Sequence, residues 1–201
     1  MAVTAERFNE GMTYQQYVDQ MTQNKERFLE NYEKATVNPE DMAYFANLPE
    51  PVHMLVIAED WCGDVIAGLP VLGKLLDGAG DKLNVRVFLR DQNEDIMNQY
   101  LKEGQYKSIP VFVAYDAQMH ELGYFIERPA ALTSEMQKAR NEFFAAHPEL
   151  GVGPDADFGG MSQEARQAMG PAMNSIRAER GGVHNQMLVD ELKQIATPVA
   201  A

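Results

Sequence analysis

The chain contains a single cysteine among its 201 residues, Cys62, so no disulfide can form within the molecule. Disulfides persist in oxidising compartments and are rare in the cytosol, so a chain that forms none agrees with a reducing environment. The first residues also lack an apolar stretch as long as the core of a secretory signal peptide. We therefore expect a cytoplasmic protein.

Basic residues are also few, because 17 Lys and Arg stand against 30 Asp and Glu, for a formal net charge of −13. A surface with this excess of negative charge repels nucleic-acid phosphates and anionic lipid headgroups. No stretch approaches the ~18 apolar residues that suggest a membrane-spanning helix. The sequence thus predicts neither a nucleic-acid partner nor a membrane partner.

Histidines are few as well, and they match no spacing that is typical of metal ligands. The four histidines are His53, His120, His147 and His184. We expect neither a metal ion nor an organic cofactor. Three acidic residues, Glu59, Asp60 and Asp64, do gather in one short segment, where a cation site is one interpretation. We favour the other interpretation, solvated charges at a helix start, because a helix N-terminus attracts negative charge.

What the sequence does contain is an alternation of strand-like and helix-like segments. Strands are predicted at 51–58, 83–89, 111–115 and 121–126, and the first run is apolar almost throughout, as in a central strand covered on both faces. Helices are predicted from the cysteine to about Leu76, from Asn93 to near Gly104 and from about Ala131 to Ala146. This order predicts an α/β protein with a mixed sheet of four to five strands flanked by helices.

Further helical patterns lie on either side of this region. Apolar residues at helical spacing from Tyr14 to Tyr32 predict one long amphipathic helix with Thr13 as its N-cap. A shorter helix is predicted from Asn38-Pro39 to about Asn47. After a glycine-rich connection, helical pieces are expected at 162–169, 172–180 and 183–196, the first two split by Gly170-Pro171.

We divide the chain into an N-terminal helical extension at 1–48, a sheet domain at 49–148 and a C-terminal helical extension at 149–201. Three placements of the C-terminal extension are open: it fills out the core, lies over the cysteine, or exchanges with a neighbour in a homodimer. We favour the first placement. The 12 methionines are interpreted as adaptable core side chains.

Three motifs in the sheet domain carry a resemblance to a known family. The sequence Trp-Cys-Gly-Asp at 61–64 follows a hydrophobic strand, Pro70 lies eight positions beyond the cysteine, and Ser-Ile-Pro-Val-Phe at 108–112 opens a strand. In this order they resemble the active-site turn, the helix proline and the cis-proline of the thioredoxin family. The resemblance implies a thioredoxin-like fold for 49–148, with helical extensions at both ends.

The thiol of Cys62 is favoured as thiolate at a helix N-terminus, because unpaired N–H groups and the positive end of the helix dipole stabilise negative charge. Trp61 shields one side of the thiol and offers apolar surface to a partner, and Gly63 lets the backbone turn tightly. The resemblance further implies a cis peptide bond before Pro110. It also implies that Ile109 offers backbone hydrogen bonds to an extended substrate.

The chain also departs from the family pattern. Val65 stands where the family has its second active-site cysteine, and Val56 aligns with the family's buried acid. A cycle in which a resolving thiol expels the substrate therefore cannot operate within one molecule. The carboxylate of Asp64 opposes the helix N-terminus and raises the pKa of the Cys62 thiol. These two effects have opposite signs, and the sequence leaves their balance open.

Two hypotheses of different classes follow. In the first, the protein is a monothiol thiol–disulfide oxidoreductase in which Cys62 attacks a mixed disulfide and an external low-molecular-weight thiol regenerates it. Its substrate-binding residues are then Trp61, Gly63, Asp64, Ile109 and Pro110. In the second, the protein is a non-catalytic thioredoxin-fold module that binds a partner through the same groove. The expected partner is a protein or a low-molecular-weight thiol or disulfide.

Overall fold

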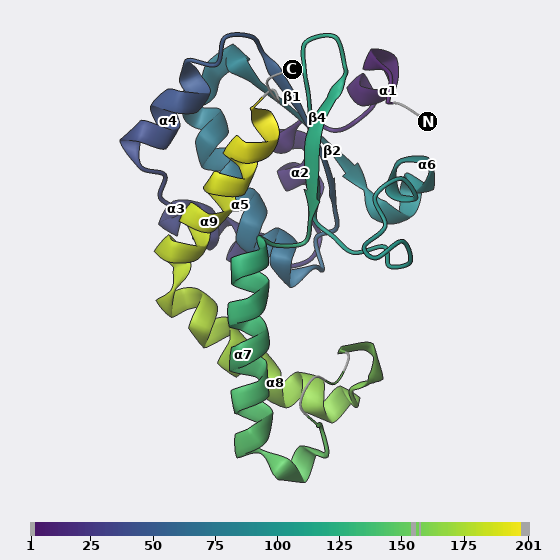
Figure 1. Ribbon diagram of the computed structural model, residues 1–201, viewed down its shortest axis with the longest axis vertical. Coiled ribbons are helices and arrows are strands. Elements are labelled where there is room, and N and C mark those ends of the chain that lie inside the picture. The colour runs from purple at the N-terminus through teal and green to yellow at the C-terminus, as the bar shows by residue number, and fades with distance from the viewer. Residues whose placement is uncertain (1–2, 154–155, 157, 198–201) are drawn as a thin grey trace.

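The computed structural model describes residues 3–153, 156 and 158–197. Its centre is a four-stranded mixed sheet with strand order β2-β1-β3-β4. The strands are β1 (Val52–Ala58), β2 (Leu83–Leu89), β3 (Val111–Tyr115) and β4 (Glu121–Ile126). β1 pairs in parallel with β2 and antiparallel with β3, and β3 pairs antiparallel with β4. The sheet lies in the upper body of the molecule in Figure 1, above a helical arm, and confirms the predicted α/β thioredoxin-like fold.

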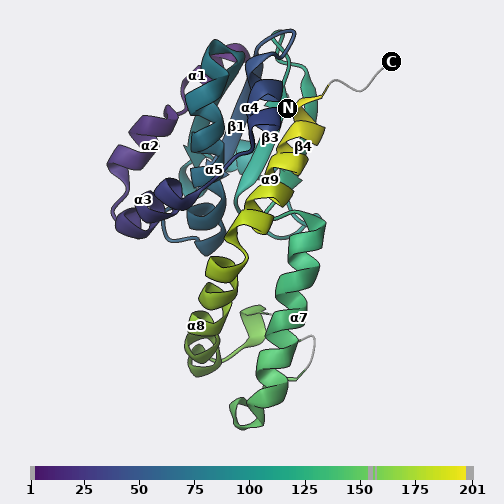
Figure 2. The same cartoon turned by 90° about the vertical axis from the view of Figure 1, so that its left-hand side faces the viewer.

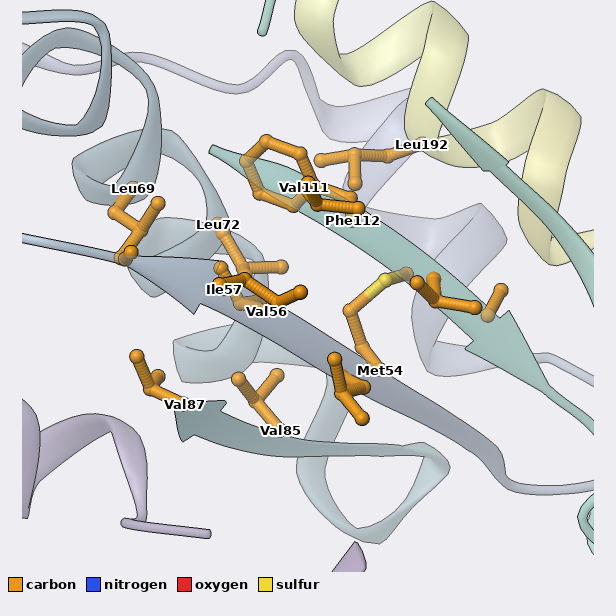
Figure 3. Packing of buried hydrophobic residues seen from close by; sticks show 14 of the residues in the cluster. Met54, Val56, Ile57, Leu69, Leu72, Val85, Val87, Val111, Phe112 and Leu192 are labelled. Carbon is orange, nitrogen blue, oxygen red and sulfur yellow. The ribbon is translucent and has the colours of Figure 1, made fainter. Parts of the chain in front are cut away.

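Strand β1 lies in the middle of the core because its side chains are apolar on both faces. Residues from Met54 to Ala58 have no exposed surface, and in the sheet register Val56 stands opposite Val87 on one side and Phe112 on the other. Figure 3 shows these side chains packed with residues of the covering helices, Leu69, Leu72 and Leu192. Full burial of one such side chain stabilises the fold by about 1.5–3 kcal/mol. This packing fixes the end of β1, where the cysteine segment begins.

The helix that follows the cysteine, α5 (Gly63–Ala79), is longer than predicted. It continues past Leu76 and stops where Gly80 adopts a positive φ of 57°. It packs against α3 (Lys25–Lys34), α4 (Pro39–Ala46) and α9 (Gly181–Ala196). Helix α6 (Glu94–Met97), in contrast, is much shorter than the predicted helix to Gly104. Glu103 and Gly104 have φ values of 53° and 70°, which a right-handed helix cannot contain.

Before the sheet, the described residues form four α-helices, namely α1 (Ala5–Asn9), α2 (Tyr14–Gln20), α3 (Lys25–Lys34) and α4 (Pro39–Ala46). The hydroxyl of Thr13 accepts a hydrogen bond from the N–H of Gln16, which confirms the predicted N-cap. Asn38 caps α4 in the same way and confirms the predicted short helix. The phenylalanines Phe8, Phe28 and Phe45 join the main hydrophobic core, so these helices pack as part of the body.

The prediction of one continuous helix from Tyr14 to Tyr32 is wrong, because the chain turns between α2 and α3. The carboxylate of Asp60 accepts hydrogen bonds from the backbone N–H groups of Thr22, at 2.7 Å, and Gln23, at 2.9 Å. Asn24 follows with a positive φ of 56°. These bonds satisfy the backbone in a non-helical conformation. Asp60 is only 8% exposed, so its interpretation as a solvated charge is also wrong.

The C-terminal part of the chain forms α7 (Ala130–Ala146), α8 (Gln163–Glu179) and α9 (Gly181–Ala196). Helices α7 and α8 pack against each other as a hairpin that projects from the body (Figures 1 and 2). The hairpin has a small apolar core of its own, made of Met136, Phe144, Met161, Ala165, Met169 and Met173. The predicted split at Gly170-Pro171 is wrong, because α8 runs through it. Pro171 removes the hydrogen bond to the carbonyl of Gln167, whose exposed position lets water replace it.

Helix α9 returns to the body and packs on β3, β4 and α5. Its inner side chains Leu188, Val189, Leu192 and Ile195 are buried in the main core. The core-filling placement that the sequence favoured therefore fits α9. Helix α8 instead packs with α7 around the separate apolar core of the hairpin. Within the described residues, none of the helices has the length and the apolar character that a membrane crossing requires.

Candidate functional site

Cys62 precedes the first residue of α5, and its side chain is half-buried. Its Sγ donates a hydrogen bond to the backbone carbonyl oxygen of Ile109 over 3.5 Å. The peptide bond from Ile109 to Pro110 is cis and leads directly into β3. Two motifs that lie 47 residues apart in sequence are thus in direct contact at the thiol.

The surroundings of Cys62 favour the protonated thiol. Burial raises the pKa of the Cys62 thiol, the N–H groups of Val65 and Asp64 at the start of α5 lower it, and the carboxylates of Asp64 and Glu127 raise it further. Together these effects raise the pKa of Cys62 above the ordinary thiol value, so burial and the nearby carboxylates outweigh the helix N-terminus. The thiol is therefore protonated at neutral pH, and its hydrogen bond to the Ile109 carbonyl requires that proton.

Trp61 lies beside the thiol with 44% of its surface exposed. The guanidinium group of Arg90 stands over the indole ring, 4.8 Å from the ring centroid, in a cation–π arrangement. Arg90 also donates a hydrogen bond to the carbonyl of Lys107 at 3.4 Å and pairs with the carboxylate of Asp91. Arg90 therefore links the tryptophan to the loop that leads to the cis peptide bond.

Asp64 is held by two arginines. Its carboxylate pairs with Arg128, at 3.3 Å, and with Arg177 of α8, at 3.2 Å, and the side chain is only 19% exposed. The favoured interpretation of Asp64 as a solvated charge is therefore wrong. The ion pairs connect the start of α5 with the β4–α7 junction and with the C-terminal hairpin.

A cleft of about 640 Å³ opens beside the thiol. Five of the six site residues predicted from the sequence line it, namely Trp61, Cys62, Gly63, Asp64 and Ile109. Pro110 is buried behind Ile109 and does not line the cleft. The opposite wall comes from one face of α7 and one face of α8, so the hairpin that Figure 2 shows below the body forms half of the site.

Sequence reasoning missed the residues of this second wall. They include the three methionines Met136, Met169 and Met173, which the sequence predicted only as core side chains. Six basic residues also line the cleft, namely Arg90, Lys107, Arg128, Arg140, Arg166 and Arg177. In the sequence these residues are dispersed, and no local pattern joins them to the cysteine.

A second cavity, of about 650 Å³, adjoins the cleft, because Asp64, Arg128 and Arg177 line both. Cys62 does not line this second cavity. In the part of the chain that the structure describes, no group of three His, Cys, Asp or Glu side chains is arranged to hold a metal ion.

Two solved structures resemble this fold. A protein of unknown function from Pseudomonas aeruginosa has a TM-score of 0.59 and 18% sequence identity, over 89% of this chain and 99% of that chain. An HIV epitope scaffold has a TM-score of 0.58 and 19% identity, over 88% of this chain and 99% of that chain. At these identities the likeness shows the fold alone.

Comparison with curated proteins gives no match. A comparison with family models gives a match to a model described as thioredoxin, over residues 11–140. The matched region includes the cysteine segment, the cis peptide bond and the whole sheet. Because this match covers more than half of the residues, the chain belongs to the thioredoxin family.

Proposed function

We propose that the protein carries out thiol–disulfide exchange through the single thiol of Cys62, with an external low-molecular-weight thiol as the regenerating reactant. The observation that supports this most directly is the 3.5 Å contact between Cys62 Sγ and the Ile109 carbonyl at the edge of a cleft. A substrate disulfide bound along that edge reaches the sulfur and the Ile109 backbone together.

The reaction has two displacement steps. In the first, the Cys62 thiolate attacks one sulfur of a disulfide R–S–S–R′, so that the bond Cys62–S–S–R forms and R′–S⁻ leaves and takes up a proton. In the second, a free thiolate R″–S⁻ attacks the R sulfur and releases Cys62 as thiolate. The net change converts R″–SH and R–S–S–R′ into R–S–S–R″ and R′–SH, and the protein itself is neither oxidised nor reduced.

The raised pKa of Cys62 limits the thiolate fraction at neutral pH. It has a compensating effect, because the intrinsic nucleophilicity of a thiolate increases with its pKa. Backbone N–H groups of Val65 and Asp64 point to the sulfur and stabilise the thiolate once it forms. We therefore expect a slow reaction that accelerates as the pH increases.

A second candidate function is non-catalytic binding of a partner through the same cleft. Two observations favour it: the pKa of Cys62 is raised, and the fully buried Val65 occupies the place of a resolving cysteine. In this function Trp61 and the cleft contact the partner, and the thiol forms no covalent bond.

Mass spectrometry of the intact protein distinguishes the two functions. The protein is incubated with bis(2-hydroxyethyl) disulfide and then with a free thiol. Exchange predicts one adduct on Cys62 that the free thiol removes, and no adduct on the Cys62→Ser variant. If the wild-type protein gains no adduct even at alkaline pH, the exchange function is rejected and the binding function stays.

A further inference from the structure

We propose that the α7–α8 hairpin is a hinged lid over the cleft of Cys62, which turns about residues 127–129 at one end and about Gly181 and Gly182 at the other. The inference goes beyond the proposed function and does not depend on it, because a lid controls access to the thiol for exchange and for binding alike. It is derived from the way in which the hairpin is attached to the body.

The hairpin is packed as a unit of its own. Its apolar side chains form a core that is separate from the main core. Among the described residues, none from 127 to 187 belongs to the main core. Glu135 of α7 and Arg180 at the end of α8 also pair at 3.2 Å, so the two helices are joined near the body as well. A unit with a core of its own can move relative to the body without unfolding.

The hairpin and the body meet through polar bonds. Arg27 of α3 donates a hydrogen bond to Asn174 of α8 over 2.7 Å, and Asp64 of α5 pairs with Arg177 of α8 over 3.2 Å. Ion pairs that are partly open to solvent hold two elements together only weakly. These bonds therefore keep the hairpin in place without fixing it.

The boundary between the hairpin and the body is also loosely packed. The cleft of about 640 Å³ and the adjoining cavity of about 650 Å³ are each lined by residues of both parts. A close-packed protein interior has few voids that are larger than a water molecule. The hairpin thus has space into which it can move.

Both connections of the hairpin have the features of a hinge. On one side, Glu127 has a positive φ of 65° and is followed within three residues by the start of α7. On the other side, α8 ends at Glu179 and α9 begins with Gly181 and Gly182. A Cβ atom at either glycine would meet no atom within 4 Å, so crowding does not require glycine there. Hinges are commonly a few residues at the ends of elements, and glycine adopts the widest range of backbone angles.

The hairpin covers the thiol in this structure. Its helices form the wall of the cleft that stands opposite Cys62, and Met136, Met169 and Met173 belong to that wall. The volume of the closed cleft lies within the range of ~300–1,000 Å³ that is usual for small-molecule sites. If the hairpin swings away, this wall is removed and a larger partner reaches the sulfur.

The first test measures access to Cys62 with two reagents that have the same reactive group, N-ethylmaleimide and a maleimide attached to a long polyethylene glycol chain. The rate of the bulky reagent is divided by the rate of the small one, and this access ratio is compared with that of a small free thiol. The thiolate fraction of Cys62 cancels from the ratio. If about a tenth of the molecules are open, the access ratio is about tenfold lower in the protein, because the bulky reagent reacts with the open fraction alone.

Arg27→Ala tests the bond to Asn174 from the body side. Arg27 lines the second cavity and not the cleft of Cys62, so the surroundings of the thiol are unchanged. The access ratio is expected to increase about threefold. Lys34→Ala is the matched control, because Lys34 also lies on α3 and lines the second cavity but pairs with Glu30 of the same helix. It is expected to leave the ratio unchanged.

The double variant Gly181→Ala with Gly182→Ala tests the hinge in the opposite direction. Alanine fits at both positions and favours the helical backbone that the closed hairpin has there. The access ratio is expected to fall about two- to fivefold. The rate with N-ethylmaleimide and the urea midpoint of unfolding show that the variant is folded.

The second test follows the hairpin itself. In Cys62→Ser, the substitutions Glu33→Cys on α3 and Glu142→Cys on α7 place two spin labels at exposed positions, one on the body and one on the hairpin. Pulsed electron paramagnetic resonance gives the distribution of distances between them. We expect a main distance and a second population, which increases in Arg27→Ala and decreases in the double alanine variant.

The outcomes decide the inference separately from the proposed function, since neither test involves a disulfide. A single narrow distance that no variant alters overturns the hinge. An access ratio equal to that of the free thiol overturns the lid, even if the hairpin moves. An increase in Lys34→Ala as large as that in Arg27→Ala also overturns the inference, because the effect is then one of charge on α3.

Discussion

The carboxylate of Asp64 and the guanidinium group of Arg177 lie 3.2 Å apart, although 113 residues separate them in sequence. Asp64 is the second residue of the helix that begins next to the thiol, and Arg177 lies in the last turn of α8. This ion pair connects the charge that raises the pKa of Cys62 to the hairpin that forms the opposite wall of the cleft.

The Asp64→Asn variant is predicted to react faster through Cys62. Loss of the carboxylate removes one of the charges that raise the pKa of the thiol, and it leaves Arg128 and Arg177 without their shared partner. Both changes favour the thiolate. The pH dependence of alkylation by iodoacetamide is expected to shift to lower pH, with a higher rate at neutral pH.

Glu33→Gln is the control for this experiment, because Glu33 is exposed on α3, does not line the cleft and is not among the groups that shift the pKa of Cys62. An unchanged alkylation profile in Asp64→Asn would show that the carboxylate of Asp64 does not contribute to the raised pKa of Cys62. The ion pairs themselves are expected to contribute less than about 1 kcal/mol to stability, since they are partly open to solvent.

Asp60 is predicted to contribute strongly to stability. Its buried carboxylate accepts hydrogen bonds from the backbone N–H groups of Thr22 and Gln23 and thereby fixes the turn between α2 and α3. Removal of a buried acceptor that leaves its donors unpaired costs about 1–3 kcal/mol. Asp60→Ala should therefore unfold at clearly lower urea concentration than the wild-type protein.

The matched variant Asp60→Asn retains one acceptor oxygen and should lose less stability than Asp60→Ala. Equal loss in both variants would mean that the negative charge, and not the acceptor geometry, holds this turn. Cys62 and the cleft are unchanged in either variant, so alkylation of folded protein should proceed at the wild-type rate.

The sequence alone predicted the features that are determined by residues close together in the chain. The apolar run of β1 can be buried only in the middle of a sheet, and the segments around Cys62 and Pro110 indicated the family from local residues. The break at 21–24 could not be predicted from periodicity, because it depends on hydrogen bonds to Asp60 from a distant part of the chain.

The second wall of the site was not predictable for a similar reason. The residues of α7 and α8 have helical spacing, but this spacing does not specify which surface they face. Arg140 and Arg177 become site residues only because the hairpin stands beside the cysteine. The methionines were interpreted as core side chains, and Met136, Met169 and Met173 are buried in the hairpin core, yet these three also line the cleft.

Asp41 is predicted to make stability depend on acidic pH. It is 3% exposed and accepts hydrogen bonds from Lys193 and Gln186 of α9 and from Asn38. Burial by itself raises the pKa of Asp41, but the hydrogen bonds and the charge of Lys193 act in the opposite direction, and the net pKa is lowered.

A carboxylate with a lowered pKa in the folded state stabilises the protein above its unfolded-state pKa of ~3.9, and this contribution is lost as the pH falls through the folded-state value. Asp41→Asn cannot titrate. The difference in free energy of unfolding between wild type and variant should be about 1.5–3 kcal/mol at neutral pH and should shrink below pH ~3.9. A difference that is constant from neutral to acidic pH would show that packing, not ionisation, explains the effect.

The Val65→Cys variant is predicted to gain disulfide reductase activity. Residue 65 lies in the first turn of α5, and its side chain is fully buried below the half-exposed Cys62. A thiol at this position is shielded from external disulfides, so Cys62 remains the attacking group and the new thiol can expel the substrate from the mixed disulfide. The substitution removes little volume from the core and should cost about 1 kcal/mol of stability.

Turnover of a protein disulfide with dithiothreitol as reductant is expected in Val65→Cys and absent in the double variant with Cys62→Ser. A folded Val65→Cys protein that shows neither turnover nor an internal disulfide after oxidation would mean that the scaffold around Cys62 does not support exchange.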